Sequence, residues 1–265
     1  TWDEMWELGD KAMEEGIYLF TYPTAGYFDA FLYALMNVVG GPEFFEKATH
    51  YEEGIWETPE ADQLFEILDK LADYTHPSTP AQANNQDFTR NQLMVMTDEA
   101  LFMPNGTWII GEMAEAEIAQ DVADGFQWGM TALPALDADS IGYSYTFLEQ
   151  AWIPAGAENV EAAKQFIAFL YSDTAADIFA KGGAVQPIRG MTDQLEGDNK
   201  LFYSIYDSGA GAAMGSFAAY SPIPGIDNTS VFFEPINSLV GGTLTIDQWK
   251  ANIISATDQM RANLS

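Results

Sequence analysis

Acidic side chains are the most abundant groups in this sequence that could do chemistry, and three of them have aromatic neighbours. Glu112, Glu149 and Glu234 each lie within a few residues of a tryptophan, tyrosine or phenylalanine. Two carboxylates on either side of a glycosidic bond could serve as the acid and the base of a glycoside hydrolase. The sequence does not fix the distance between any two of these glutamates, so a hydrolase using a carboxylate pair stays open as an alternative function.

Sequence motifs for metal, nucleotide or nucleophilic chemistry are absent. There is no GxGxxG before a helix, no GxxxxGK, no GxSxG and no HExxH, and there is no cysteine. His50 and His76 are far apart, which favours surface loops, and Asp137 with Asp139 lacks the further oxygen ligands of a calcium loop. We therefore expect no catalytic residue, no metal site and no cofactor.

Aromatic residues at the starts of loops and helices give the strongest indication of a ligand. Tyr22 and Tyr27 flank the turn at Pro23, and Trp108 follows an Asn-Gly turn. Such positions lie at the carboxyl ends of strands, where α/β sheets bind ligands. Aromatic rings stack on the apolar face of a pyranose, and Asn, Asp or Glu accept hydrogen bonds from its hydroxyls. Together these aromatics predict a sugar, whereas each one alone is as well explained by core packing.

The charge balance excludes several classes of partner. The 265 residues include 40 acidic and 10 basic side chains, a net charge of −30, and the basic residues are scattered along the chain. This charge repels phosphate, so we expect no nucleic-acid partner and no anionic membrane partner. The longest stretch without charge, 208–226, is rich in Gly, Pro and Ser, so we expect no membrane insertion by this segment. The acidity suits a saline habitat or an ordinary acidic secreted protein equally well.

Hydrophobic periodicity and capping residues predict short strands alternating with more numerous helices, an α/β fold. Thr1 with Glu4 predicts a capping box, and Thr58 and Thr245 predict N-caps. The predicted helices are 2–16, 27–39, 58–74, 88–96, one from Trp108 capped by Thr107, 159–170, 173–182 and one from 246, and the predicted strands are 17–22, 101–103 and 128–133. Ala163, Phe166, Ile167 and Leu170 are expected on the inward face of their helix.

Several sequence blocks, in this order and spacing, resemble the maltose-binding-protein-like solute-binding proteins of carbohydrate ABC importers. The blocks are TWDE at 1–4, GYF at 26–28, ALFMPNGTW at 100–108, GMTALP at 129–134, AAKQFIAFL at 162–170, GGAVQP at 182–187 and the helix start at 241–247. The segment TYPTAGYF at 21–28 and Glu149-Gln150 look most similar to the N-acetylglucosamine and chitobiose branch.

The resemblance implies a periplasmic-binding-protein-like fold of type II, with two α/β lobes that close on a ligand. On this mapping the N-terminal lobe is incomplete in this sequence. Residues 1–148 would form the first part of the second, C-terminal lobe, and 207–265 its final part. Residues 149–206 would supply a crossing strand and helices of the incomplete first lobe, which would expose an unpartnered apolar face.

The resemblance also implies ligand-binding residues. Tyr27 and Trp108 match stacking aromatics of the family, and Asn105 matches either a hydroxyl partner or a turn-forming residue. Glu149 departs from the glycine pair common in the family and becomes a candidate acceptor, and Phe232 or Phe233 would supply the aromatic of the last loop. The expected ligand-binding set is Tyr22, Tyr27, Phe28, Asn105, Trp108, Glu149 and Phe232.

The function implied by the resemblance is non-enzymatic. The protein is expected to bind a mono- or oligosaccharide between its lobes and to deliver it to the membrane permease subunits of an ABC transporter. Its expected location is extracytoplasmic, either periplasmic or as a cell-surface lipoprotein. The alternatives are the glycan-processing hydrolase and an interaction module whose exposed apolar face recruits a second polypeptide.

Overall fold

The computed structural model describes residues 1–84, 88–147, 150–182, 184 and 188–265. The helices are α1 (Trp2–Glu14), α2 (Asp29–Thr49), α3 (Pro59–Asp73), α4 (Thr79–Gln82), α5 (Thr89–Met96), α6 (Ile109–Glu115), α7 (Val160–Leu170), α8 (Asp173–Lys181), α9 (Gly197–Asp207), α10 (Pro235–Val240) and α11 (Ile246–Ala262). Short helical turns are η1 (Thr24–Phe28), η2 (Ile55–Glu57), η3 (Glu117–Ala119), η4 (Met191–Gln194) and η5 (Thr229–Phe233). The strands are β1 (Tyr18–Phe20), β2 (Ala100–Phe102), β3 (Tyr143–Tyr145) and β4 (Gly211–Ala213).

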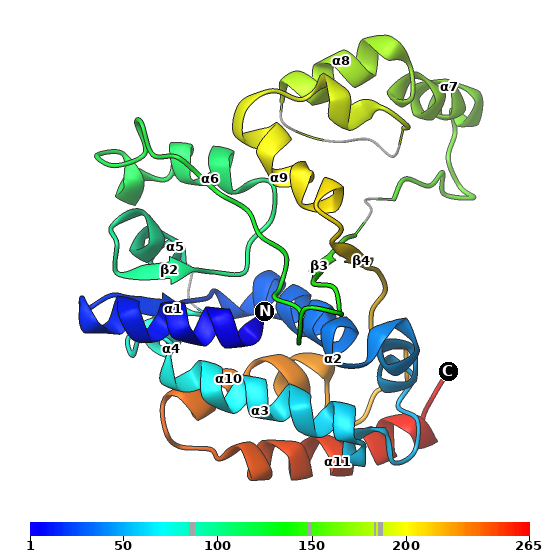
Figure 1. Cartoon of the computed structure of the whole chain (residues 1–265). Helices are drawn as coiled ribbons and strands as arrows, with labels where there is room; N and C mark the ends of the chain where they lie inside the picture. The colour runs from blue at the N-terminus through cyan, green and yellow to red at the C-terminus, as the bar shows by residue number, and fades with distance from the viewer. Residues whose placement is uncertain (85–87, 148–149, 183, 185–187) are drawn as a thin grey trace.

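Helix α2 lies at the centre of the main core (Figure 1). Every residue from Phe31 to Val39 is buried, and α2 contacts α3, β3, β4 and η1. Asn37 is buried among apolar neighbours because its side-chain amide donates to the Tyr33 carbonyl at 3.0 Å. A helix that is apolar all round needs partners on every side, and α2 has them.

The predicted close of the first helical segment at Gly40-Gly41 is confirmed, but the second segment that follows it within α2 was not predicted. The helix bends at Gly41, where φ is 66° and ψ is −172°, and continues from Pro42 to Thr49. Only glycine adopts that backbone conformation readily, and proline suits the first turn of the helical segment that follows. The Gly-Gly-Pro sequence therefore ends the first helical segment and, through a kink, starts a second one.

Two small parallel sheets organise the strands. β1 pairs with β2 in the register Tyr18↔Ala100 and Phe20↔Phe102, and β3 pairs with β4 in the register Tyr143↔Gly211 to Tyr145↔Ala213. The predicted strand at 128–133 is not formed, and only a single bridge joins Leu133 to Tyr143. A run of apolar residues there packs as an extended segment without a ladder of hydrogen bonds.

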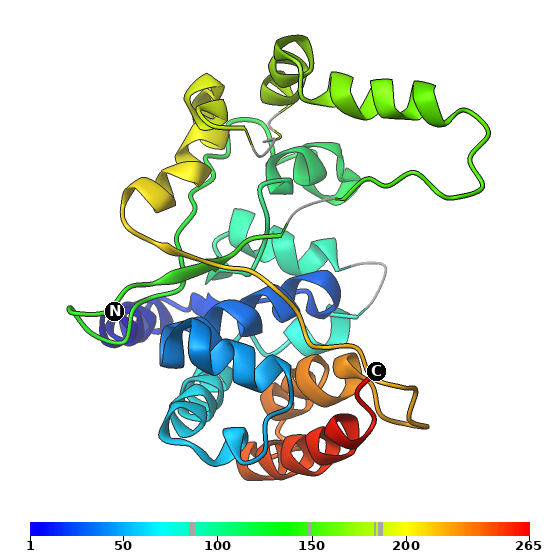
Figure 2. The ribbon, with the colours of Figure 1, turned by 90° about the vertical axis from the view of Figure 1, so that its right-hand side faces the viewer.

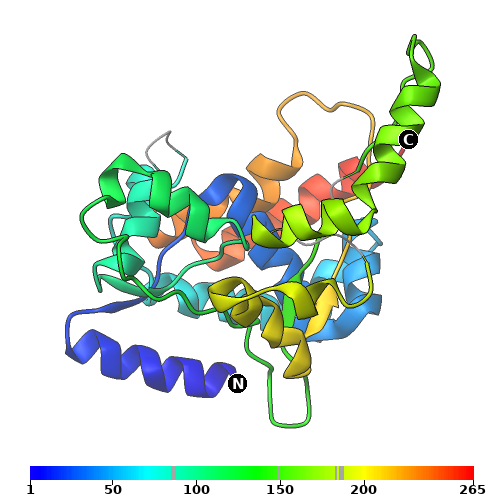
Figure 3. The same cartoon turned by 90° about the horizontal axis from the view of Figure 1, so that it is seen from above.

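The chain leaves the core through β3 and returns through β4 (Figures 1 and 2). Between these strands, α7 and α8 lie on the side of the strand pair away from α3 and α11, and Figure 3 shows α7 reaching outward from the rest of the molecule. No residue of α7 is buried, and Phe166 is 61% exposed. The expected burial of Ala163, Phe166, Ile167 and Leu170 is therefore not found, since Phe166 is exposed and the other three are only half-buried.

Helix α9 is better anchored than α7. Its Phe202 is buried in a second, smaller cluster with Met96, Ile109 and Met113, which ties α9 to α5 and α6. Among the described residues, no helix is long and apolar enough to cross a membrane, and no group of three or more His, Cys, Asp or Glu could hold a metal ion.

Candidate ligand-binding site

A row of aromatic rings runs from η1 past the start of α6 to the end of β3. We call Tyr27, Trp108, Phe147 and Tyr145 the aromatic strip. The ring centroids of Tyr27 and Trp108 are 6.0 Å apart, those of Trp108 and Phe147 are 6.0 Å apart, and those of Phe147 and Tyr145 are 6.2 Å apart. Trp108 is 39% exposed and Phe147 is 49% exposed, so both rings offer surface to a ligand.

The loop before α6 positions Trp108. The Asn105 side-chain oxygen accepts from the Gly106 amide at 2.8 Å, and its amide lies 3.7 Å from the sulfur of Met103. The Trp108 ring lies so close to Gly106 that a Cβ there would overlap it. Asn105 therefore forms the turn, and the absence of a side chain at Gly106 makes room for the indole. The predicted cap by Thr107 is wrong, because α6 begins after Trp108 without a side-chain cap.

Glu112 supplies a carboxylate one helical turn beyond Trp108. The Tyr27 hydroxyl donates to its two oxygens, at 3.1 and 3.3 Å, and the side-chain amide of the buried Gln92 donates to Oε2 at 2.7 Å. Burial raises the pKa of Tyr27, and the charge of Glu112 adds to this, so the phenol stays a donor at neutral pH. Glu112 itself is half-buried.

A second carboxylate, Asp29, lies at the start of α2. It accepts from the Ala30 amide at 2.8 Å, and burial raises its pKa. Burial and, after it, the charge of Asp29 raise the pKa of Tyr145, whose hydroxyl donates to the Gly215 carbonyl at 3.0 Å. Two acidic groups thus lie along the aromatic strip.

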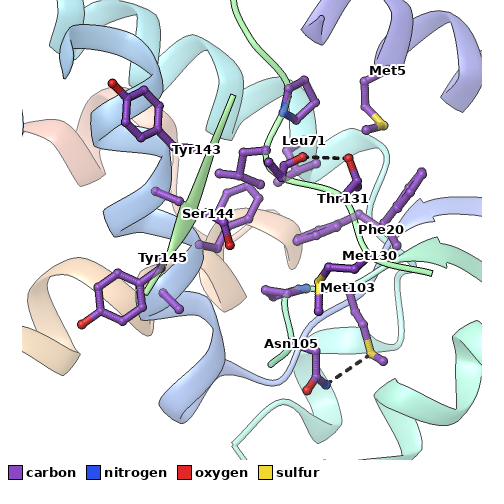
Figure 4. A pocket seen from close by; sticks show the side chains of 18 of the residues that line it. Met5, Phe20, Leu71, Met103, Asn105, Met130, Thr131, Tyr143, Ser144 and Tyr145 are labelled. Atoms are coloured by element: carbon purple, nitrogen blue, oxygen red, sulfur yellow. Dashed lines mark hydrogen bonds between the residues drawn. The ribbon is translucent and has the colours of Figure 1, made fainter. Parts of the chain in front are cut away.

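An apolar cavity of about 130 Å³ lies beside the strip, between β1, β2 and β3 (Figure 4). Asn105 and Tyr145 are at one end, and Met5 and Leu71 are at the other. The hydroxyl of Thr131 donates to the Ala132 carbonyl, so it is engaged within the protein. Because a hydroxyl-rich ligand needs free polar partners, the aromatic strip and not this cavity is the better candidate for a sugar.

The structure brings together some of the predicted binding residues and places others in the core. Tyr27, Asn105 and Trp108 lie together at the strip. Tyr22, Phe28 and Phe232 are fully buried, so the expectation that they contact the ligand is corrected. Glu149 lies outside the described residues.

The buried aromatics have structural partners instead. The Tyr22 hydroxyl donates to the side-chain oxygen of Asn237 at 3.0 Å, which joins η1 to α10. Phe232 stacks on Phe217 at a centroid distance of 4.0 Å, and Phe28 stacks on Phe31 at 5.4 Å. An aromatic residue at the start of a loop can anchor that loop to the core as readily as it can contact a ligand.

Five residues of the site were absent from the expected ligand-binding set: Asp29, Gln92, Glu112, Tyr145 and Phe147. The alternation Tyr143, Tyr145, Phe147 puts aromatic side chains on one face of an extended segment, and this signal could have found Phe147. Gln92 had no such signal, since only the tertiary fold brings it to Glu112.

The fold is that of the two-lobe solute-binding proteins. Solved structures similar to this chain include a chitin oligosaccharide binding protein (TM-score 0.68, 16% identity, 99% of this chain and 65% of that chain). Another is a Bacillus licheniformis sugar transporter in complex with stachyose (TM-score 0.61, 16% identity, 99% of this chain and 66% of that chain). At this level of identity the likeness establishes the fold.

Residues 1–196 match the family of bacterial extracellular solute-binding proteins, and the chain belongs to this family. Among curated proteins, the diacetylchitobiose binding protein NgcE of Streptomyces coelicolor is 28% identical over 190 residues. That match covers 68% of this chain and 39% of NgcE, so the chain spans well under half the length of this relative. The family assignment confirms the resemblance seen in the sequence blocks.

Proposed function

We propose that this protein binds a carbohydrate at the aromatic strip and serves as the receptor of an ABC importer. The observation that carries the proposal is the placement of Trp108, which is exposed, packs on Gly106 and lies next to Tyr27, whose hydroxyl donates to the Glu112 carboxylate. A pyranose would stack its apolar face on the indole and donate hydroxyls to the carboxylate.

The relatives support this proposal and suggest the sugar. NgcE is named for diacetylchitobiose, one structural neighbour is named for chitin oligosaccharide, and another holds stachyose. We therefore propose an N-acetylglucosamine-containing mono- or oligosaccharide as the ligand, within the wider class of carbohydrates.

The partners and location follow from the family. The permease subunits of an ABC transporter would receive the ligand from a closed, ligand-bound form, since binding shifts an equilibrium between open and closed states. The protein would work outside the cytoplasm, in the periplasm or anchored at the cell surface. The division into 1–148, 149–206 and 207–265 is part of the same proposal, with the middle segment contributing to a first lobe.

Binding without turnover is favoured over glycan hydrolysis. The family is one of solute-binding proteins, and NgcE is named as a binding protein. Of the carboxylates considered for a hydrolase, Glu112 is held by Tyr27 and Gln92, whereas Glu234 is exposed between η5 and α10.

The test is a titration of intrinsic tryptophan fluorescence in the full natural chain. The sugars are N-acetylglucosamine, diacetylchitobiose, maltose and xylobiose, and each mixture is then examined for hydrolysis products. Saturable quenching by at least one sugar without hydrolysis is the expected result, with diacetylchitobiose or N-acetylglucosamine binding tightest. A flat response to all four would contradict the proposal, and the appearance of shortened sugars would favour the hydrolase.

A further inference from the structure

We infer that Glu112 determines which ligands the aromatic strip accepts, by taking hydrogen bonds from a pair of donors on a neutral or cationic sugar ring and rejecting anionic ones. The inference rests on the proposed carbohydrate-binding function. It names Glu112 as the residue that binds polar groups of the sugar at that site. The donors on the ligand are either two neighbouring hydroxyls or one ammonium group. Both kinds of group donate hydrogen bonds to a carboxylate, through O–H or through N–H.

The hydrogen bonds of Glu112 leave acceptor capacity for a ligand. An ionised carboxylate has about four lone-pair positions. Tyr27 and Gln92 are the side chains that donate to it among the described residues. Glu112 is half-buried, follows Trp108 by one helical turn on α6, and is bonded by Tyr27, whose ring neighbours the exposed ring of Trp108, so its remaining acceptor positions are available beside the strip.

The surroundings of Gln92 indicate that its hydrogen bond to Glu112 serves ligand binding and not the stability of the fold. The side chain is fully buried, its Nε2 donates to Glu112, and its Oε1 is buried without a hydrogen-bond partner among the described residues. A buried amide oxygen left unpaired is destabilising, because it has lost its hydrogen bonds to water without gaining one in the protein. Turning the amide over would point its oxygen at the carboxylate, which is worse. Gln92 is therefore a positioning residue that holds Glu112 toward the strip.

The charges around Glu112 favour neutral or cationic sugars over anionic ones. Within the described residues no Lys, Arg or His forms an ion pair with it, and Asp29 adds a second carboxylate along the strip. The whole chain carries −30. A ligand carboxylate would meet like charges without a cation to compensate, whereas hydroxyls or an ammonium group would find acceptors.

The experiment compares Glu112→Gln with Glu115→Gln in the full natural chain. Glu115 is the matched control because it is exposed on the same helix and also loses one charge. Calorimetric titrations use diacetylchitobiose, N-acetylglucosamine, glucosamine and glucuronate. Circular dichroism checks that each variant is folded, and Tyr27→Phe, which keeps the ring and removes one donor to Glu112, is a second variant that leaves the carboxylate in place.

We expect Glu112→Gln to weaken binding of the sugars that bind about tenfold or more, since hydrogen bonds to a charged group are worth roughly that factor. Glu115→Gln should change affinity less than twofold, Tyr27→Phe should weaken binding by an intermediate amount, and glucuronate should bind weakest to the natural protein. If glucosamine loses more affinity than N-acetylglucosamine in Glu112→Gln, the donor is an ammonium group; equal losses identify hydroxyls.

Two results would overturn the inference while leaving the proposed function intact. One is sugar binding by Glu112→Gln with unchanged affinity, in a folded protein whose Trp108→Ala variant has lost affinity. The other is glucuronate binding as tightly as glucosamine. Failure of the natural protein to bind any of these sugars would instead overturn the proposed function, and the inference with it.

Discussion

Helices α3 and α7 have the same kind of amphipathic sequence but different surroundings. In α3 the apolar face of Ala61, Leu64, Phe65, Leu68 and Leu71 is buried against α2, α10 and α11. In α7 the equivalent face, with Phe166 and Ile167, has no buried residue. The comparison teaches that a periodic sequence specifies which face of a helix is apolar, but not whether a partner covers it.

The largest expected difference between the two regions is in core packing. Phe65→Ala should lower the free energy of unfolding by about 3–5 kcal/mol, because Phe65 is 4% exposed and its removal leaves a cavity. Phe166→Ala, the same change at a 61% exposed position, should lower it by less than about 0.5 kcal/mol. Chemical denaturation of both variants measures the two values. Similar losses of unfolding free energy in the two variants would show that α7 is covered in solution. The helices α3 and α7 would then not differ in burial.

The next largest difference is in sugar binding, between variants of two exposed tryptophans, Trp108 and Trp152. Trp108→Ala should weaken sugar binding by about 1–3 kcal/mol, a factor of roughly 5 to 150, because an aromatic contact with the ligand is lost. Trp152 is 77% exposed on the segment that leads to α7, and Trp152→Ala should leave the affinity unchanged. Calorimetry with the tightest-binding sugar checks both. Equal affinity in Trp108→Ala and the natural protein would remove Trp108 from the site.

Local sequence signals predicted the elements of the core well. The capping box at Thr1 and the N-caps at Thr58 and Thr245 are confirmed, and Thr245 also forms a full capping box with Gln248. These features depend on neighbours within a few residues, so they can be read from the sequence. The break at Gly40-Gly41 was predicted as well, but the helical segment from Pro42 to Thr49 was not, because what packs beyond a Gly-Gly pair decides how the chain continues.

The site was harder to predict from the sequence, because its polar residues are far apart in the sequence and meet only in the folded chain. Tyr27 and Trp108 were predicted from their places beside turns and from the family resemblance. Glu112, the hydrogen-bond partner of Tyr27, was considered only for hydrolysis, and its second donor, Gln92, had no local signal on α5. Tyr22, Phe28 and Phe232 have the same local signals as Tyr27 yet are completely buried, whereas Tyr27 is 9% exposed and its hydroxyl reaches Glu112, a difference that only the whole fold decides.

Matched helix caps give a smaller and more local comparison. Thr58 Oγ1 accepts from the Ala61 amide and Ser172 Oγ accepts from the Ala175 amide, both at 3.3 Å, at the starts of α3 and α8. Removing such a cap destabilises a helix by about 0.5–2 kcal/mol. Thr58→Ala should lower the global free energy of unfolding by about that amount, because α3 belongs to the main core.

Ser172→Ala should instead loosen α8 without much change in global stability. Amide hydrogen exchange should be faster in the first turn of α8, while the exchange of α3 stays as in the natural protein. The same decrease in global stability for both variants would mean that α7 and α8 unfold together with the core.

The smallest expected effect is the pH dependence of the buried charge at the start of α2. Burial raises the pKa of Asp29 above its ordinary value, so its ionisation opposes folding. The contribution of such a group to stability is fully present below the unfolded-state pKa, near 4, and is lost as the pH rises through the folded-state value. Asp29→Asn removes the charge and keeps an oxygen that can accept from the Ala30 amide.

At pH 7 we therefore expect Asp29→Asn to melt on the order of a degree or more above the natural protein, and the gain should shrink toward zero below about pH 4. Asp173→Asn is the control, because Asp173 is also in the first turn of its helix but is exposed on α8. Thermal denaturation across this pH range measures both variants. A gain for Asp29→Asn that does not change with pH would mean that side-chain packing, not the buried charge, is the cause.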